Sequence, residues 1–167
     1  MNGRNSFSVV FDFLNTKNNA MGTGSQYAII HCMHEDTPYP GFAIQYKRLS
    51  SGTVEYGADF IINSNNAYVG VSRGGYTSDR RVKMVLTVDY SSNKITMYSN
   101  INGTSETSEN DIPSGTPTVS ETALIGCYQD TNGNRGRYSL GTMYDFKIYD
   151  RALTSEEAQA YLAVDHS

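Results

Sequence analysis

Paired carboxylates are the residues of this chain that come nearest to hydrolytic chemistry. Glu55 and Asp59 are four positions apart, so on a strand they point to one face, and Glu109 and Asp111 are two apart. Retaining glycosidases need two carboxyl groups about 5 Å apart. A glycine-alanine pair breaks the strand pattern inside the first pair. Ile112-Pro113-Ser114 follows the second pair, in a stretch expected to be a loop, without the second glutamate that a catalytic set on one strand would need. We therefore expect both pairs to be solvated or structural.

Nucleophilic catalysis has less support. The chain has no Gly-x-Ser-x-Gly sequence, which in hydrolases presents the serine on a tight turn. His31 and His34 are three positions apart, so on a strand they face opposite sides, and His166 lies near the end of the sequence. Gly22-Thr23-Gly24 precedes no helix, so we do not expect it to hold a phosphate. The sequence does not predict an enzyme.

Tyrosines beside loops offer a different chemistry, the recognition of sugars. Apolar sugar faces stack on aromatic rings, and sugar hydroxyls bond to amide, carboxylate and guanidinium groups. The chain has 13 Tyr and no Trp, and binding residues concentrate in loops. The tyrosines in or beside polar stretches are Tyr39, Tyr68, Tyr76, Tyr128 and Tyr138. The set that we expect to bind a ligand is Tyr39, Tyr128, Asn132, Asn134, Arg135 and Tyr138. Packing inside the fold is the alternative role for each tyrosine.

Length and charge narrow the possible classes. A chain of 167 residues is expected to form one domain. Its net charge of −4 gives no basic surface for nucleic acid, so we expect no such partner. No apolar run is long enough for a membrane-spanning helix, and the first residues do not resemble a signal peptide.

The two cysteines give little scope for cross-links or metal. Cys32 and Cys127 each lie in an apolar stretch, which favours buried free thiols over one disulfide. Neither has a second cysteine or a histidine at metal-site spacing, so we do not expect a structural zinc.

Alternating apolar residues and turn clusters predict an all-β chain. The expected strands are residues 7–14, 27–33, 42–49, 54–62, 82–90, 95–98, 124–128 and 143–149. Turn clusters at 63–66 and 70–75 leave a short segment at Tyr68-Val69, and residues 105–118 are expected to form a surface loop. Asn102-Gly103 predicts a tight turn.

One helix is expected, near the end of the chain. Thr154 followed by Glu157 makes a capping box, and Leu153 and Ala158 suit a hydrophobic staple across it. The sequence thus predicts a two-sheet antiparallel jelly-roll sandwich with a short C-terminal helix, as a single domain over residues 1–167.

The closing segment is similar to that of a known family. The strand Tyr144-Asp145-Phe146-Lys147-Ile148-Tyr149 leads through Arg151-Ala152-Leu153 into the capped helix. This pattern resembles the end of laminin-G-like and pentraxin-like domains of the concanavalin A-like lectin/glucanase superfamily, and the resemblance extends over nearly the whole chain. The family usually has a further strand before the first one found here. The chain is therefore expected either to belong to a longer protein or to have an edge that a neighbour covers.

The resemblance also implies a calcium site. In pentraxin-like domains a Glu-Gln-Asp set and an aspartate of an earlier loop hold calcium, which prefers converging oxygen ligands. The matching residues here are Gln129 and Asp130, with Tyr128 in place of the first carboxylate, and Asp36 in the earlier loop. The alternative is that these residues only shape turns.

A non-catalytic recognition module is the function that the resemblance implies. Its partner would be a glycan or a surface protein, bound by loops with or without the help of calcium, at an extracellular, cell-surface or virion-surface location. The alternative is a structural module of a larger phage or adhesin-type protein, packed against neighbouring domains or subunits. A carbohydrate-active enzyme is the third possibility.

A calcium site at Asp130 predicts that excess calcium raises the melting temperature relative to chelator. A ligand bound only by the folded state stabilises it by about 2.7 kcal/mol at about 100-fold excess over Kd. The shift should vanish in Asp130→Ala. An unchanged melting temperature at millimolar calcium would assign Gln129 and Asp130 to the turn alone.

Overall fold

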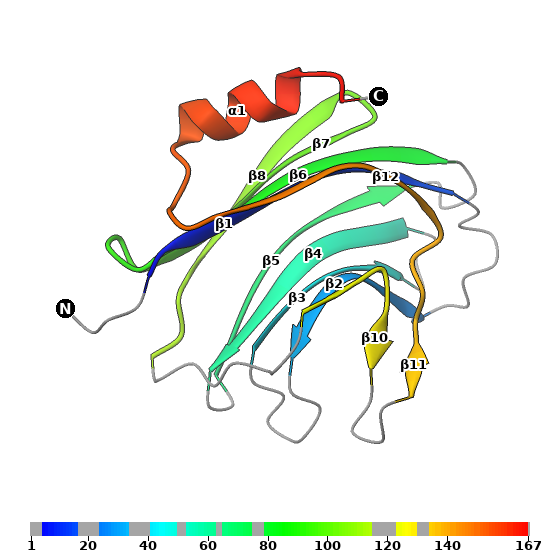
Figure 1. The fold of residues 1–167 in the computed structure, drawn as a ribbon, viewed down its shortest axis with the longest axis horizontal. Coiled ribbons are helices and arrows are strands. Elements are labelled where there is room, and N and C mark those ends of the chain that lie inside the picture. The colour runs from blue at the N-terminus through cyan, green and yellow to red at the C-terminus, as the bar shows by residue number, and fades with distance from the viewer. Residues whose placement is uncertain are drawn as a thin grey trace. The chain divides into compact units, whose positions relative to one another are not determined.

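The computed structural model describes residues 5–16, 24–33, 41–49, 53–62, 65–74, 79–114, 123–129 and 134–166. Within these ranges the chain forms two five-stranded antiparallel sheets, a two-stranded ribbon and one helix (Figure 1). The chain divides into two compact units, one of residues 1–16, 79–112 and 141–167 and the other of residues 17–78 and 113–140. Each unit contains one of the five-stranded sheets.

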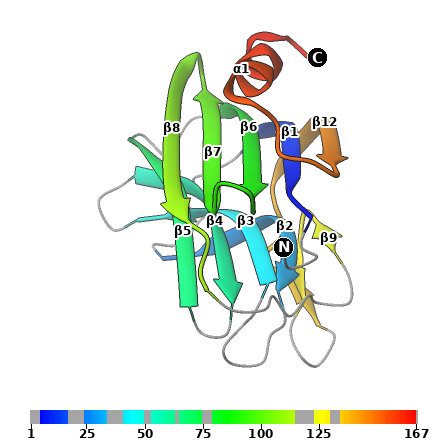
Figure 2. The same cartoon turned by 90° about the vertical axis from the view of Figure 1, so that its left-hand side faces the viewer.

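The first unit is a sheet in the order β12-β1-β6-β7-β8 with helix α1 (Figure 2). Its elements are β1 (Phe7–Asn15), β6 (Arg80–Asp89), β7 (Lys94–Ile101), β8 (Thr104–Asp111), β12 (Gly141–Tyr149) and α1 (Ser155–Ala163). Alternation in β1 and β6 places Phe11 and Met84 on one face and Val10 and Val85 on the other. All four are fully buried, so the central strands of this sheet are covered on both faces.

Helix α1 covers one face of this sheet. The Glu157 N–H donates to the Thr154 hydroxyl at 3.3 Å and the Thr154 N–H donates to Glu157 Oε2 at 2.9 Å, which confirms the predicted capping box. The buried cluster beneath the helix consists of Val10, Val85, Leu153, Ala158 and Leu162. No helix in the described ranges is long and apolar enough to cross a membrane.

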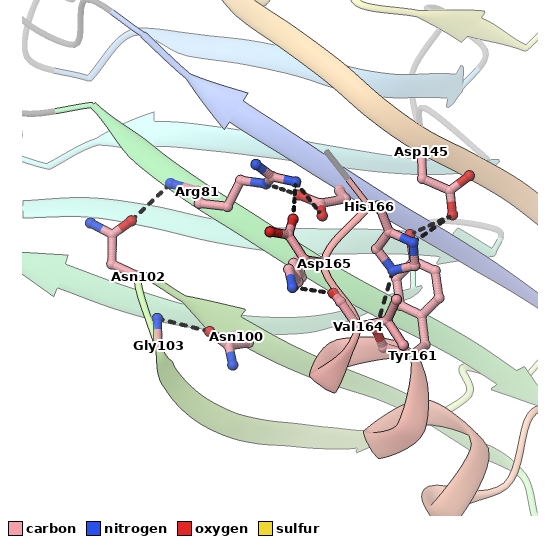
Figure 3. Close-up of polar contacts among 11 residues, drawn as sticks. Arg81, Asn100, Asn102, Gly103, Asp145, Tyr161, Val164, Asp165 and His166 are labelled. Carbon is pink, nitrogen blue, oxygen red and sulfur yellow. Dashed lines mark hydrogen bonds and ion pairs between the residues drawn. The ribbon is translucent and has the colours of Figure 1, made fainter.

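Polar contacts fasten the residues after α1 to the same unit (Figure 3). Arg81 forms an ion pair with Asp165 at 3.4 Å, and its Nη2 donates to Oδ2 of the fully buried Asp12 at 2.8 Å. The His166 ring stacks on Tyr161 with their centroids 4.5 Å apart. Since an isolated buried carboxylate is costly, Arg81 is the partner that makes Asp12 tolerable in the sheet.

The second unit is a sheet in the order β5-β4-β3-β2-β9 with a separate β10-β11 ribbon. Its elements are β2 (Gln26–Met33), β3 (Gly41–Arg48), β4 (Thr53–Ile62), β5 (Asn65–Gly74), β9 (Leu124–Ile125), β10 (Tyr128–Gln129) and β11 (Arg135–Gly136). Ile44, Tyr46 and Tyr56 lie on one face and are buried. The opposite face carries polar residues.

Two segments that we expected to be turns or loop are strands. β5 occupies most of the region assigned to turns at 63–66 and 70–75, and β8 occupies the first part of the loop assigned to 105–118. Both are edge strands, paired in full register with β4 and β7. Their Asn, Ser, Thr and Gly content is typical of loops, but pairing with a stable neighbour overrides such propensities.

The strand expected at 124–128 is interrupted. Gly126 has φ +77°, outside the β region, and separates β9 from β10. The other expected strands are present, with their ends displaced by a few residues at most. Cys32 and Cys127 are buried free thiols, as expected.

Leu162→Ala is expected to lower the free energy of unfolding by about 2–5 kcal/mol, because it removes a side chain buried beneath α1. Gln159→Ala on the exposed side of the same helix is the control and should change it by less than about 0.5 kcal/mol. Urea denaturation measures both. Equal effects would mean that α1 does not depend on its buried face.

Candidate functional site

One face of the β2–β5 sheet presents polar side chains from four adjacent strands. Directly paired residues of antiparallel strands share a face. Lys47 pairs with Gln26 and Glu55, Gln45 pairs with Gly57, and Asp59 pairs with Tyr68. A pocket of about 320 Å³ is lined by Gln26, Gln45, Lys47, Glu55, Asp59 and Tyr68. We call these six residues the polar face.

The Tyr68 ring rests on two glycines. Gly57 of β4 and Gly70 of β5 are directly paired. A Cβ built on Gly57 would lie 2.3 Å from the Tyr68 hydroxyl oxygen, and one built on Gly70 would lie 2.2 Å from it. The ring therefore occupies the space above the backbone where side chains of these strands would otherwise stand.

Hydrogen bonds fix both carboxylates of the polar face. Gln45 Nε2 donates to Asp59 Oδ2 at 2.6 Å. Burial raises the pKa of Asp59 above its ordinary value, an effect that hydrogen bonds from Asn66 and Gln45 oppose. The Tyr68 hydroxyl forms a hydrogen bond with Glu55, and burial together with this carboxylate raises the pKa of Tyr68. The two acids are thus oriented acceptors for hydroxyl or N–H groups of a ligand.

A second pocket adjoins the first. It has a volume of about 510 Å³ and is lined by Gly24, Ser25, Gln26, Tyr27, Arg137, Tyr138 and Leu140. Gln26 lines both pockets. Because Arg137 Nη1 donates to Gln26 Oε1 at 3.3 Å, a guanidinium stands beside the amide that the two pockets share.

Backbone geometry places Arg137. The residue has φ +50°, and its carbonyl accepts a hydrogen bond from the Ala28 N–H of β2 at 3.1 Å. Its guanidinium carbon lies 4.4 Å from the centroid of the Tyr128 ring, a cation–π contact. A guanidinium held in this way keeps a planar fork of donors that matches a carboxylate.

His31 adjoins the same arginine without adding charge. Its ring meets Tyr128 edge-on, with the centroids 5.0 Å apart. Burial lowers the pKa of His31 to about 4, and the positive charge of the nearby Arg137 is a second, smaller cause of this shift. At neutral pH the imidazole is uncharged, so Arg137 supplies the positive charge at this place.

The sequence-predicted ligand residues are only partly brought together. Tyr138 lines the second pocket with 54% of its surface exposed, and its hydroxyl donates to the Arg135 carbonyl at 3.1 Å. Tyr128 supports Arg137. Arg135 and Asn134 are exposed and line neither described pocket. Tyr39 and Asn132 lie outside the described residues.

The predicted calcium ligands cannot be placed as a group. Asp36 and Asp130 lie outside the described residues, and so does the side chain of Gln129, whose backbone pairs with Arg135. Within the described part of the chain, no three His, Cys, Asp or Glu side chains come together to hold a metal ion.

Sequence reasoning missed most of the polar face. Glu55 and Asp59 were expected to be solvated or structural because Gly57 and Ala58 interrupt the strand pattern between them. Both acids have hydrogen-bond partners, and Gly57 makes room for Tyr68. Tyr68 was placed beside a loop but lies within β5. The alternation of polar residues in β3 and β4 could have predicted this polar face. The residues that alternate onto it are Gln45, Lys47, Glu55 and Asp59. Nothing in the sequence pointed to Arg137.

Comparison with known proteins defines the fold. No protein-family model and no curated protein matches the chain. Solved structures do: CBM40 of the Ruminococcus gnavus IT-sialidase bound to α2,6-sialyllactose has a TM-score of 0.70 at 13% identity, covering 95% of this chain and 84% of that one. Its complex with α2,3-sialyllactose gives 0.68 at 12% identity, covering 93% and 82%.

A larger enzyme contains a similar domain. The NanB sialidase of Streptococcus pneumoniae matches 95% of this chain with a TM-score of 0.66 at 18% identity, but only 24% of the enzyme is covered. The chain thus has an all-β, two-sheet antiparallel sandwich fold with one short C-terminal helix, as expected. It is the fold of CBM40 carbohydrate-binding modules. The resemblance to laminin-G-like and pentraxin-like domains stays a prediction.

The pKa of His31 predicts a pH dependence of stability. Because the folded-state pKa is about 4 and the ordinary value is 6.5, the unfolded chain binds the extra proton first as pH falls. His31 therefore lowers the free energy of unfolding progressively from about pH 6.5 to about pH 4. In His31→Phe this part of the loss should be absent when urea denaturation is compared at pH 7 and pH 4.5. An identical pH dependence in the two proteins would contradict the assignment.

Proposed function

We propose that this chain is a non-catalytic glycan-binding module that recognises sialylated glycans. The glycan would bind to the polar face and to the second pocket, which Arg137 lines. The observation that carries the proposal is the place of Arg137, beside an amide shared by two pockets. A sialic acid presents one carboxylate among several hydroxyls. A site that binds it therefore needs one cationic side chain surrounded by neutral side chains and hydrogen-bond acceptors.

The side chains around Arg137 match that requirement. Gln26 and Gln45 offer amides, and Tyr138 offers an exposed ring for stacking. Each is held by a neighbouring group: Gln26 by Arg137, Gln45 by Asp59 and Tyr138 by a backbone carbonyl. Such preorganisation reduces the entropy lost on binding.

The solved structures with the same fold support sialylated glycans as the class of ligand. Two of them are CBM40 modules in complex with sialyllactose. The chain covers most of that module but a quarter or less of the NanB sialidase. An extracellular, cell-surface or virion-surface location belongs to this proposal, since a protein at such a location meets the sialylated glycans that cells display. Calcium at Asp36, Gln129 and Asp130 stays a separate proposal.

A structural module is the second candidate function. Ile148 is 60% exposed on β12, an edge strand of the first unit. Exposed apolar residues on an edge strand favour pairing with another chain or domain. A stable oligomer that does not respond to sialylated glycans would support this function over the first.

Arg137→Ala is expected to weaken the binding of sialyllactose about ten- to hundredfold, because a charge-assisted hydrogen bond is worth about 1.5–3 kcal/mol. Isothermal titration calorimetry with α2,6-sialyllactose measures the loss of affinity. The same titration with lactose, which lacks the sialic acid, shows whether the loss depends on the carboxylate. Arg151→Ala removes another exposed arginine, in the first unit, and should bind as the wild type does. If both variants bind equally, Arg137 does not hold the carboxylate.

A further inference from the structure

Tyr68 lies flat on the sheet. Its side chain starts two residues before Gly70 on β5 and ends above the Gly57–Gly70 pair, so the long axis of the ring follows the strand. One ring edge, Cε1, approaches the Gly70 position and the other, Cε2, approaches the Gly57 position, so the ring width spans from β5 to β4. One face of the ring therefore rests on the backbone, and the other points away from the sheet into the 320 Å³ pocket.

Only glycines allow this position. An alanine at Gly57 would place its Cβ 2.6 Å from Tyr68 Cζ, and an alanine at Gly70 would place it 2.5 Å away. Both contacts are far shorter than carbon atoms tolerate, so the ring would have to leave the surface. Glycine normally weakens a strand because it has no side chain to pack. Two paired glycines beneath one ring thus point to a use for the flat ring.

The charges around Tyr68 exclude an acidic ligand group at this place. Glu55 is hydrogen-bonded to the Tyr68 hydroxyl, and Asp59 is its direct cross-strand neighbour. Lys47 also lines this pocket and is the direct cross-strand neighbour of Glu55, so the pocket holds two carboxylates and one ammonium group. A carboxylate bound over the ring would meet a net negative charge. A neutral sugar would instead lay its C–H face on the ring and donate hydroxyl hydrogens to the carboxylates.

Arg137 lies some strands away from the Tyr68 ring. Strands β2, β3, β4 and β5 lie side by side in this order (Figure 1). The Arg137 carbonyl is hydrogen-bonded to β2, and the Tyr68 ring lies over the Gly57–Gly70 pair of β4 and β5. Adjacent strands are about 4.8 Å apart, so roughly two to three strand spacings, about 10–14 Å, separate them. That separation exceeds one pyranose ring and suits two linked sugars.

We propose that Tyr68 is the stacking platform for a neutral sugar that is linked to the acidic sugar held by Arg137, and that Gly57 and Gly70 create this platform. This inference rests on the proposed function and adds a second subsite to it. The module then recognises an acidic sugar together with its neutral neighbour, and the neighbour contributes to affinity through stacking.

Calorimetric titration with α2,6-sialyllactose and with free sialic acid tests the platform. Tyr68→Ala should weaken sialyllactose binding about two- to tenfold, the effect of losing one aromatic contact, and leave free sialic acid unchanged. Tyr68→Phe keeps the ring and should bind sialyllactose nearly as the wild type does. Tyr144→Ala, which removes a tyrosine of the first unit, is the matched control.

Gly57→Ala tests the support of the ring. It should cause the same loss as Tyr68→Ala, and the double variant should lose no more than either single one, because both act by removing the ring from its place. Gly136→Ala, at a glycine of the same unit with open space around it, is the control. Thermal melts verify that each variant is folded.

The outcomes separate the two proposals. If the wild type binds sialyllactose and Arg137→Ala weakens it while Tyr68→Ala does not, the platform is wrong and the proposed function stands. Equal losses for sialyllactose and free sialic acid in Tyr68→Ala would also overturn the neutral subsite. If the wild type binds neither sugar, both proposals fail.

Discussion

The candidate site depends on the register of β3 against β4. Ile44, Tyr46 and Tyr56 are buried on one face of these strands, and their burial decides which residues the other face presents. A shift of β3 by one residue would turn its side chains over, exposing Ile44 and Tyr46 and burying Gln45 and Lys47. The hydrophobic effect therefore disfavours that shift strongly, although Ile44, Tyr46 and Tyr56 line neither described pocket. The polar face is positioned by the side chains beneath it.

The same sheet carries features that reduce stability and serve the site. Gly57 and Gly70 forgo side-chain packing at the centre of β4 and β5. Burial disfavours the charged form of Asp59, which Gln45 and Asn66 hold in place. The buried face of the sheet and its full register with β3 offset these costs. Binding residues on strands, rather than on loops, are held rigidly by such a scaffold.

The parts of the fold that could be predicted are those with a strong local signal. Alternating apolar residues marked β1 and β6, and Thr154 with Glu157 marked the start of α1. β8 lacked that signal because its residues are polar on both faces. In β5 the alternating Ala67, Val69 and Val71 are buried, but the asparagines and glycines of the same segment resemble a loop. The site was harder still. Loop tyrosines led to Tyr138, but Arg137 reaches its place through a left-handed backbone and a hydrogen bond to β2, neither of which leaves a pattern in the sequence.

The segment that contains Arg137 is attached to its neighbours by main-chain hydrogen bonds, whereas the faces of the sheet beside it are fixed by buried side chains. The Ala28 N–H bonds to the Arg137 carbonyl and the Ser139 N–H bonds to the Gly126 carbonyl at 2.8 Å, so main-chain atoms attach the segment to its neighbours. The main-chain hydrogen bonds do not involve the side chain of residue 137, although its positive φ disfavours β-branched residues there. An evolving lineage could exchange the charge at this position, and with it the acidity of the preferred sugar, while β3, β4 and β5 stayed unaltered. If the proposed function holds, selectivity for the acidic sugar can change independently of the scaffold.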